Sequence, residues 1–192
     1  MFDPPRGDAC FSDDKHRLGL RRWWKDQPER WVAWLMLNPS EAGRKPSDPT
    51  MNRVNHFTKT WGFDGCIVVN LYPFVAPRKA DMWSWRDALR DRDGINWWHY
   101  SAEMECNLIQ IEEAGRSSSL RIVAFGVNPV KDPIWVKMCL DKFEQHSDGT
   151  QKRFRCLDTT KEGWPTHPHA RGKYRVDDDA KDKPWIPPTI LL

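Results

Sequence analysis

Three short apolar runs dominate the hydrophobic pattern of the chain. They cover residues 31–37 (WVAWLML), 66–71 (CIVVNL) and 120–125 (LRIVAF). Each run is too short for a typical helix and lacks regular alternation with polar residues, as in strands buried on both faces of a parallel sheet. Residues 153–157 predict a fourth strand, and residues 10–20 a short strand pair that turns at its Ser-Asp-Asp sequence.

Helical patterns occupy the stretches between these strands. We expect helices over residues 51–60, within residues 91–114 from about Gly94 or Ile95, and over residues 132–145. Thr50 is the expected N-cap of the first helix and Gly62 its stop. Pro133 fits the first position of the third helix, where its missing N–H costs nothing.

Buried strands that alternate with helices indicate an α/β protein. We therefore expect a three-layer fold: a mostly parallel central sheet with helices on both faces. Its length of 192 residues suits one core. We assign residues 1–172 to a single domain and residues 173–192, which are rich in proline and charge, to a C-terminal tail on the surface.

Composition indicates a cytoplasmic protein. Hydrophobic residues make up 39% and charged residues 30%, which is too apolar for a disordered chain. No apolar run approaches the ~20 residues of a membrane helix, and the first residues lack the pattern of a signal peptide. The five cysteines form no CxxC pair, which argues against a disulfide framework and a structural zinc site.

Tryptophan and basic residues leave the partner open. The chain has 12 Trp, for which packing is the favoured interpretation and stacking on bases or sugars the alternative. The net charge is only +3, but Lys15, His16 and Arg17 cluster with Arg21 and Arg22. Such a cluster suits phosphate contacts or simply a solvated face.

Four segments follow the predicted strands. In parallel sheets ligands bind beyond the carboxyl ends of the strands. This rule selects Asn38-Pro39-Ser40, Asn70-Leu71-Tyr72, Gly126-Val127-Asn128 and residues 159–169. The functional residues are therefore expected in these loops.

Each candidate side chain has a structural and a functional interpretation. Asn38 can hold a water or form a plain Asn-Pro turn, and Asn70 can read a pyrimidine edge or cap its strand. Asp48, with Arg53 one turn later, can cap a helix or place a carboxylate at a pocket mouth to activate water. His167, held between Thr166 and a proline, can donate to a developing oxyanion.

Other common chemistries find little support. A metal site would need more ligands than His167, His169 and Asp158, the nearby candidates in sequence. The chain has no GxxxxGK, GxGxxG, GxSxG or HExxH sequence. We expect no cofactor and no metal.

Several strings resemble the domain of unknown function 1643 family. They are FSDD-x-x-R-L-x-L-x-R-x-W, MLNPSEA, DPTMNR, WGFDGCIVVNLYPF, VAFG and CLDTTKEGWPTHPHA, spread from Phe11 to Arg171. The chain departs from the usual family pattern at Val75-Ala76, at His169 and in the Trp-rich stretch 83–98. The family name implies no activity.

The order of these motifs is also similar to that of the uracil-DNA glycosylase superfamily. The corresponding pieces are Asn38-Pro39-Ser40, Asn52-Arg53, Gly62-Phe63, Asn70 and Thr166-His167-Pro168. This resemblance implies that Asn38 positions the attacking water, Asn70 reads the base and His167 stabilises charge on the departing base. The expected catalytic residues are Asn38, Asp48 and His167; the expected substrate-binding residues are Pro39, Ser40, Asn70, Tyr72, Arg53 and Lys161.

The function expected from this resemblance is that of a monofunctional, metal-independent DNA glycosylase. It flips a base into a pocket and excises it, leaving an abasic site. Because Ser40 is small, the substrate could be a pyrimidine enlarged at C5, such as the hydroxymethylated or glucosylated bases of phage DNA, which implies a defence enzyme; uracil or thymine is the alternative. The other functions are a catalytically silent nucleic-acid-binding module and a hydrolase of free nucleotides. DNA is the expected partner, with no membrane and no obligate protein partner.

Overall fold

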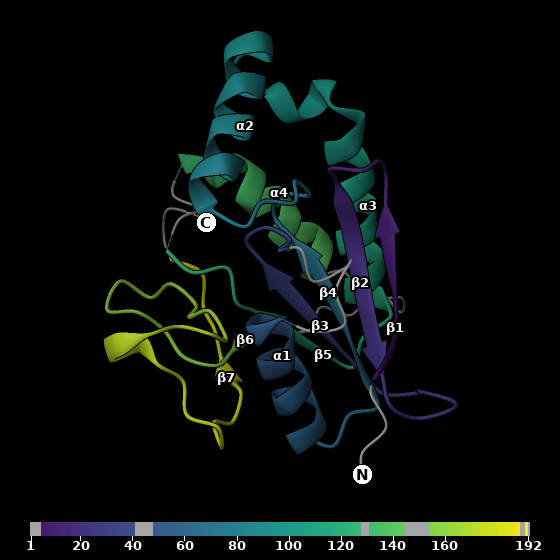
Figure 1. Cartoon of the computed structure of the whole chain (residues 1–192). Coiled ribbons are helices and arrows are strands. Elements are labelled where there is room, and N and C mark those ends of the chain that lie inside the picture. The colour runs from purple at the N-terminus through teal and green to yellow at the C-terminus, as the bar shows by residue number, and fades with distance from the viewer. Residues whose placement is uncertain (1–4, 41–47, 128–130, 145–153, 189–190, 192) are drawn as a thin grey trace.

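The computed structural model describes residues 5–40, 48–127, 131–144, 154–188 and 191. Within them the chain forms one sheet of seven strands in the order β1-β2-β4-β3-β5-β6-β7 (Figure 1). The strands are β1 (Arg6–Phe11), β2 (Arg17–Trp23), β3 (Trp31–Met36), β4 (Gly65–Asn70), β5 (Leu120–Val123), β6 (Arg155–Cys156) and β7 (Lys183–Pro184). The helices are α1 (Pro49–Thr60), α2 (Lys79–Asp93), α3 (Ala102–Arg116) and α4 (Pro133–Glu144), with short 3-10 helices η2 (Trp97–Tyr100) and η4 (Gly172–Tyr174).

The sheet is mixed. The four central strands, β4-β3-β5-β6, are parallel to their neighbours, while β1 pairs with β2, β2 with β4 and β7 with β6 in antiparallel fashion. The expectation of a mostly parallel sheet therefore holds for the centre and is wrong at both edges. Strands joined by a short turn, as β1 and β2 are, can pair only in antiparallel fashion.

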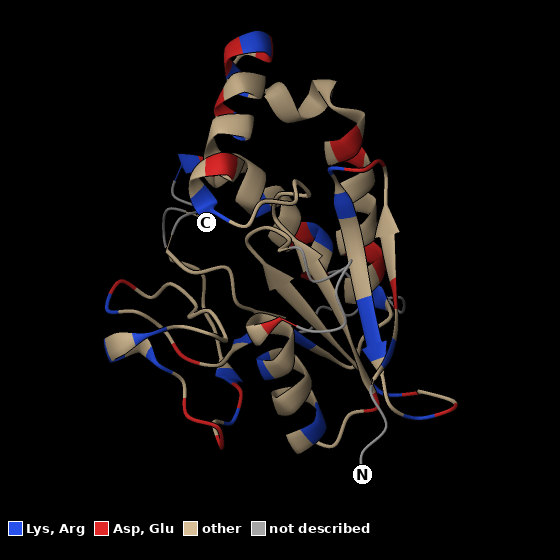
Figure 2. Ribbon diagram, in the orientation of Figure 1, with Lys and Arg blue, Asp and Glu red and all other residues tan. Residues whose placement is uncertain are grey.

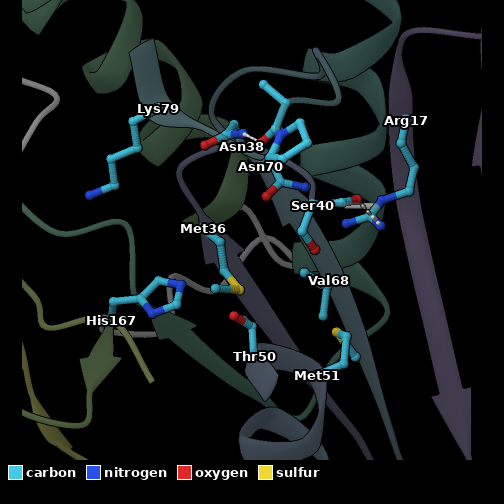
Figure 3. Close-up of a pocket in the computed structure, with 12 residues that line it drawn as sticks. Arg17, Met36, Asn38, Ser40, Thr50, Met51, Val68, Asn70, Lys79 and His167 are labelled. Atoms are coloured by element: carbon cyan, nitrogen blue, oxygen red, sulfur yellow. Dashed lines mark hydrogen bonds between the residues drawn. The ribbon is translucent and has the colours of Figure 1, made fainter. Parts of the chain in front are cut away.

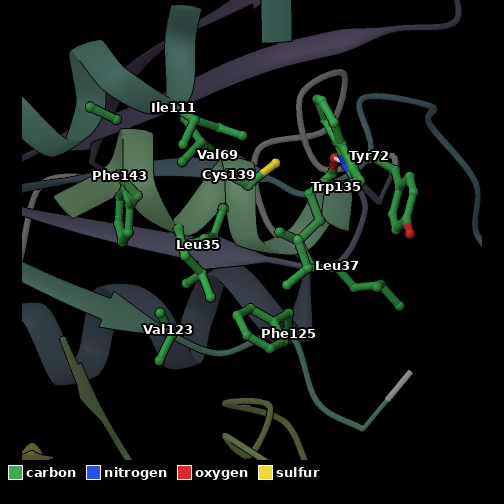
Figure 4. Packing of buried hydrophobic residues seen from close by; sticks show 14 of the residues in the cluster. Leu35, Leu37, Val69, Tyr72, Ile111, Val123, Phe125, Trp135, Cys139 and Phe143 are labelled. Carbon is green, nitrogen blue, oxygen red and sulfur yellow. Dashed lines mark hydrogen bonds between the residues drawn. The ribbon is translucent and has the colours of Figure 1, made fainter. Parts of the chain in front are cut away.

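The two faces of the sheet carry separate cores, which confirms the α/β class with helices on both faces. On β3, Val32 and Trp34 pack in a cluster with α1, whereas Ala33 and Leu35 pack in a cluster with α3 and α4. Figure 4 shows part of the second cluster, with Trp135 and Phe143 of α4 against the sheet. Because both faces are covered, the strand reads as a continuous apolar run.

The helix boundaries differ from the expected ones in two places. Asp48, not Thr50, caps α1, because its side chain accepts from the backbone N–H of Met51. The long helix expected within residues 91–114 is in fact the end of α2 and most of α3. Gly94, at φ 79°, ends α2, and Ser101 caps α3.

The segment after residue 172 is more than a surface tail. It supplies the edge strand β7, and the side chains of Val176 and Trp185 are buried. Trp185 packs against Phe125 and Phe154, with ring centroids 5.8 and 6.0 Å apart. The proline and charged residues of this segment interrupt its apolar pattern, so the sequence did not predict these contacts.

Some expectations fall outside the described residues. These are Asn128, the end of the third predicted helix at Gln145, the start of the fourth strand at Arg153 and the loop directly after Ser40. Among the described residues, no helix has the length and apolar character needed to cross a membrane.

Candidate functional site

A pocket of about 170 Å³ lies beyond the carboxyl ends of β3 and β4 (Figure 3). Its lining comes from β2, the two strand ends, α1, the start of α2 and the loop after β6. The lining residues are Arg17, Met36, Asn38, Ser40, Thr50, Met51, Val68, Asn70, Ala76, Pro77, Lys79 and His167. Asn38, Ser40, Asn70 and His167, each selected from the sequence, are thus brought together.

Asn38 is fixed by two backbone acceptors. Its Nδ2 donates to the carbonyl oxygens of Ala76, at 3.0 Å, and Pro39, at 3.1 Å. Because carbonyls accept only from the NH2 group, this pair determines which way the amide faces. The amide oxygen lies on the side of the pocket that Lys79 lines (Figure 3). Asn38 therefore presents an oriented acceptor.

Asn70, the last residue of β4, is the complementary case. Its backbone oxygen accepts from Asn107 at 3.0 Å, but its side-chain Nδ2 is buried and has no hydrogen-bond partner in the part of the chain that the structure describes. Only 1% of the residue is exposed. An unsatisfied buried donor costs about 1 to 3 kcal/mol, and this one lies in the lining of a pocket. It is a donor that a ligand can satisfy.

His167 is a neutral donor. Its Nδ1 accepts from the backbone N–H of His169 at 3.0 Å, so the proton of the neutral ring is on Nε2. Burial, with a smaller contribution from Lys79, lowers the pKa of His167 from 6.5 to about 4. Thr166 anchors the loop through its backbone N–H, which donates to the oxygen of Asp158 at 2.8 Å.

Asp48 lies behind the pocket wall. One of its carboxylate oxygens accepts from Met51 N at 2.7 Å, and the other accepts from Ser40 Oγ. Both oxygens are thus engaged in holding α1 and Ser40. Asp48 is not among the lining residues, so the structure gives it a positioning place next to the pocket.

Two cations of the lining were not selected as site residues from the sequence. Arg17 is 2% exposed and donates through Nη1 to the oxygen of Ser40 at 3.2 Å. Lys79 begins α2, on the far side of the pocket (Figure 3). The basic cluster around Arg17 was the only sequence signal for that residue. Lys79 was not selected because the sequence analysis did not predict helix α2.

Three residues expected to bind substrate lie elsewhere. Tyr72 is buried and donates from its hydroxyl to Asp132 at 2.7 Å. Arg53 holds the C-terminal segment, donating to the oxygens of Pro168, at 3.2 Å, and Val176, at 2.5 Å. Lys161 is exposed and, like these two, does not line the pocket. Strand-end position alone could not show which way each side chain turns.

Pro39, a fourth residue expected to bind substrate, is also absent from the lining and interacts through its backbone. Its oxygen accepts from the side chain of Asn38 and from the backbone N–H of Ala76, at 3.1 Å each.

Away from the pocket, Asp13, His16 and Glu103 form the one set of three potential metal ligands found in the described part of the chain. Asp13 there accepts from two backbone amides and from His16 Nδ1, as a turn residue does.

Residues 17–169 match the profile of a family described as protein of unknown function, DUF1643. The chain belongs to the DUF1643 family. The matched segment runs from Arg17 to His169, so the DUF1643 region contains every residue that lines the pocket. No curated protein and no solved structure matches the chain.

Proposed function

We propose that this DUF1643 protein is a DNA glycosylase of the uracil-DNA glycosylase type. The observation that carries the proposal is the convergence of three complementary groups in one pocket. Asn38 offers an oriented acceptor, Asn70 an unpartnered donor and His167 a neutral donor. A base excised by water needs these functions: a held nucleophile, recognition of the base edge and stabilisation of the leaving group.

Strand order supports the same place for a ligand. From β3 the chain moves to β4 on one side and later to β5 on the other, so the order of the parallel strands reverses at β3. Ligands of open α/β sheets bind at such switch points, beyond the carboxyl ends of the strands. The similarity in motif order to the glycosylase superfamily points to the same loops.

The proposed reaction needs little covalent chemistry from the protein. The flipped base accepts from Asn70, and Asn38 holds the water that attacks C1′. As the N-glycosidic bond breaks, its electron pair moves to the base, and His167 Nε2–H stabilises the resulting negative charge. The water oxygen bonds to C1′ and loses its proton to solvent, so the products are an abasic sugar and the base anion, which solvent then protonates. Lys79 adds a positive charge on the same side of the pocket.

The pocket and a neighbouring hollow each argue against one of the two alternative functions. A silent binding module does not require an oriented Asn38 and a neutral His167 facing one cavity. A hydrolase of free nucleotides does not require a basic groove. Here a second hollow, of about 350 Å³, adjoins the His167 loop and is lined by Arg171, Arg175 and His169 among others, and by Arg53, which pairs with Asp178. Figure 2 shows the basic residues around η4, with acidic residues next to them along the chain.

We further propose that the base is a pyrimidine enlarged at C5, of the kind carried by some phage DNAs, which makes the protein a defence enzyme. Ser40 is the small residue at the place where glycosylases strict for uracil have a bulky aromatic. Its side chain lines the pocket and donates to Asp48. Replacement by Tyr should fill this space and block excision of enlarged bases.

The test is base release from oligonucleotides that contain uracil, thymine, 5-hydroxymethylpyrimidine or its glucosylated form, read as alkali-labile abasic sites. Asn38→Ala and His167→Ala should each slow release by about a hundredfold or more. His99→Ala, which removes an exposed histidine outside the pocket lining, is the matched control. Full activity of the His167→Ala protein would remove that residue from the mechanism, and release from plain uracil DNA alone would reject the enlarged base.

A further inference from the structure

Arg17 is a buried cation whose hydrogen bonds are incomplete. Among the residues that the structure describes, its guanidinium donates once, to the oxygen of Ser40, and its buried Nε finds no partner. A guanidinium has five N–H donors, and each one left unmade in a buried place carries a desolvation cost. Its backbone is held in place, because its N–H donates to the oxygen of Pro73 at 2.9 Å. The unmade hydrogen bonds of this side chain therefore lower the stability of the free protein, and a bound ligand that accepts from them recovers that free energy.

The position of Arg17 in the pocket defines which part of a ligand it meets. Figure 3 shows Arg17 beside Ser40 and across the pocket from Lys79 and His167. Under the proposed function, His167 and Asn38 face the glycosidic bond, and Asn70 faces the edge of the base. Arg17 and Ser40 then face the part of the base that carries a C5 substituent.

We propose that Arg17 is a specificity-determining residue that selects bases with a hydrogen-bond acceptor on this substituent. This inference rests on the proposed function for the orientation of the base. An apolar substituent would fill the space and leave the guanidinium without an acceptor, whereas a hydroxyl or a carboxylate accepts from it. The nearby Asp48 carboxylate offsets the charge of Arg17 through space. Its two oxygens already accept from Ser40 and Met51, so the guanidinium still needs an acceptor, and a neutral one suffices.

Three nucleosides test the selection, because they differ only at C5. Thymidine has a methyl group there, 5-hydroxymethyl-2′-deoxyuridine a neutral acceptor and 5-carboxy-2′-deoxyuridine a charged one. Equilibrium binding to the wild-type protein should favour the last two over thymidine by about tenfold or more. Arg17→Met should remove this preference. Arg17→Lys should keep it for the carboxylate and weaken it for the hydroxyl, because lysine retains charge without the fork of donors.

Arg21→Met is the matched control, since Arg21 lies on the same strand and outside the pocket lining. A purely structural role of Arg17 would lower the unfolding temperature and leave the ranking of the nucleosides unchanged. If Arg17→Met does not fold, the wild-type ranking and Arg17→Lys still decide.

Equal binding of the three nucleosides, no binding of any, or a ranking untouched in the Arg17 variants would overturn the inference. The proposed function is tested separately, by base release from oligonucleotides. A protein that ranks nucleosides as expected but releases no base would keep the specificity of Arg17 and lose the glycosylase proposal. A protein that releases bases with no preference for an acceptor would do the reverse.

Discussion

At the scale of single residues, the charge state of His167 links stability to pH. Its pKa is about 4 in the folded protein against 6.5 when exposed. Between these values the unfolded chain binds more protons, so stability is complete above pH 6.5 and falls as the pH drops to about 4. Wild type should lose on the order of 1 to 3 kcal/mol more than His167→Gln over this window. Urea unfolding at both pH values measures the difference, and equal losses would contradict the low pKa.

Asn70 offers a second test at this scale, because none of the described residues pairs with its side-chain donor. Asn70→Leu removes a buried donor that has no partner, so the free energy of unfolding should stay the same or rise by about 1 kcal/mol. Under the proposed function, base release should fall by about a hundredfold, because the donor proposed to read the base is gone. A marked loss of stability would show instead that Asn70 supports the fold.

At the scale of elements, a buried ion pair joins α2 to the start of α4. Arg86 donates to both carboxylate oxygens of Asp132, the residue before α4, and Tyr72 donates to one of them. Removing one partner leaves a buried charge unpaired, so Arg86→Met should cost about 3 to 5 kcal/mol. Arg92→Met, which breaks an exposed pair with Asp93 on the same helix, should leave thermal unfolding nearly unchanged.

Tyr72 belongs to this network, and its expected place in substrate binding can be tested with it. Tyr72→Phe removes only the hydroxyl that Asp132 accepts from. Base release by the folded protein should therefore stay at the wild-type level, while its unfolding temperature falls. A selective loss of base release would instead support a role for Tyr72 in substrate binding.

The sequence predicts elements well where burial is uniform and poorly where one face is open. The run 31–37 could be recognised as a central strand because both its faces pack in separate cores. The edge strand β7 has two exposed residues and no apolar pattern. The helix α2 was missed because its mean hydropathy is low and few of its side chains are buried, among them Met82 and Arg86.

The same physical reason separates the found from the missed residues of the site. Asn38 and Asn70 follow buried parallel strands, and the carboxyl ends of such strands meet at one edge. Arg17 begins a strand that joins the sheet in antiparallel fashion, so its approach to the pocket depends on pairing that the strand-end rule does not cover. Lys79 reaches the pocket from the start of α2.

At the scale of the whole molecule, the C-terminal segment braces the loop that carries His167. Trp185 Nε1 donates to the oxygen of Gly163 at 2.9 Å, and the ring packs on Phe125 and Phe154. Its side chain therefore connects the central sheet, the last strands and the loop after β6. The DUF1643 match ends at residue 169, so this brace lies outside the matched region.

Trp185→Ala should consequently act on both stability and the pocket. The cavity left by the ring should cost about 3 to 5 kcal/mol, and the freed Gly163 oxygen should loosen the loop and slow base release even well below the unfolding temperature. Ile186→Ala is the matched control, because Ile186 is the next residue and is 81% exposed, so its removal should change stability by no more than about 0.5 kcal/mol. Thermal unfolding and base release measured on both variants separate the two effects. Wild-type stability of the Trp185→Ala protein would show that the packing of this segment adds nothing to stability, whereas a stability loss without slower base release would limit its effect to the fold.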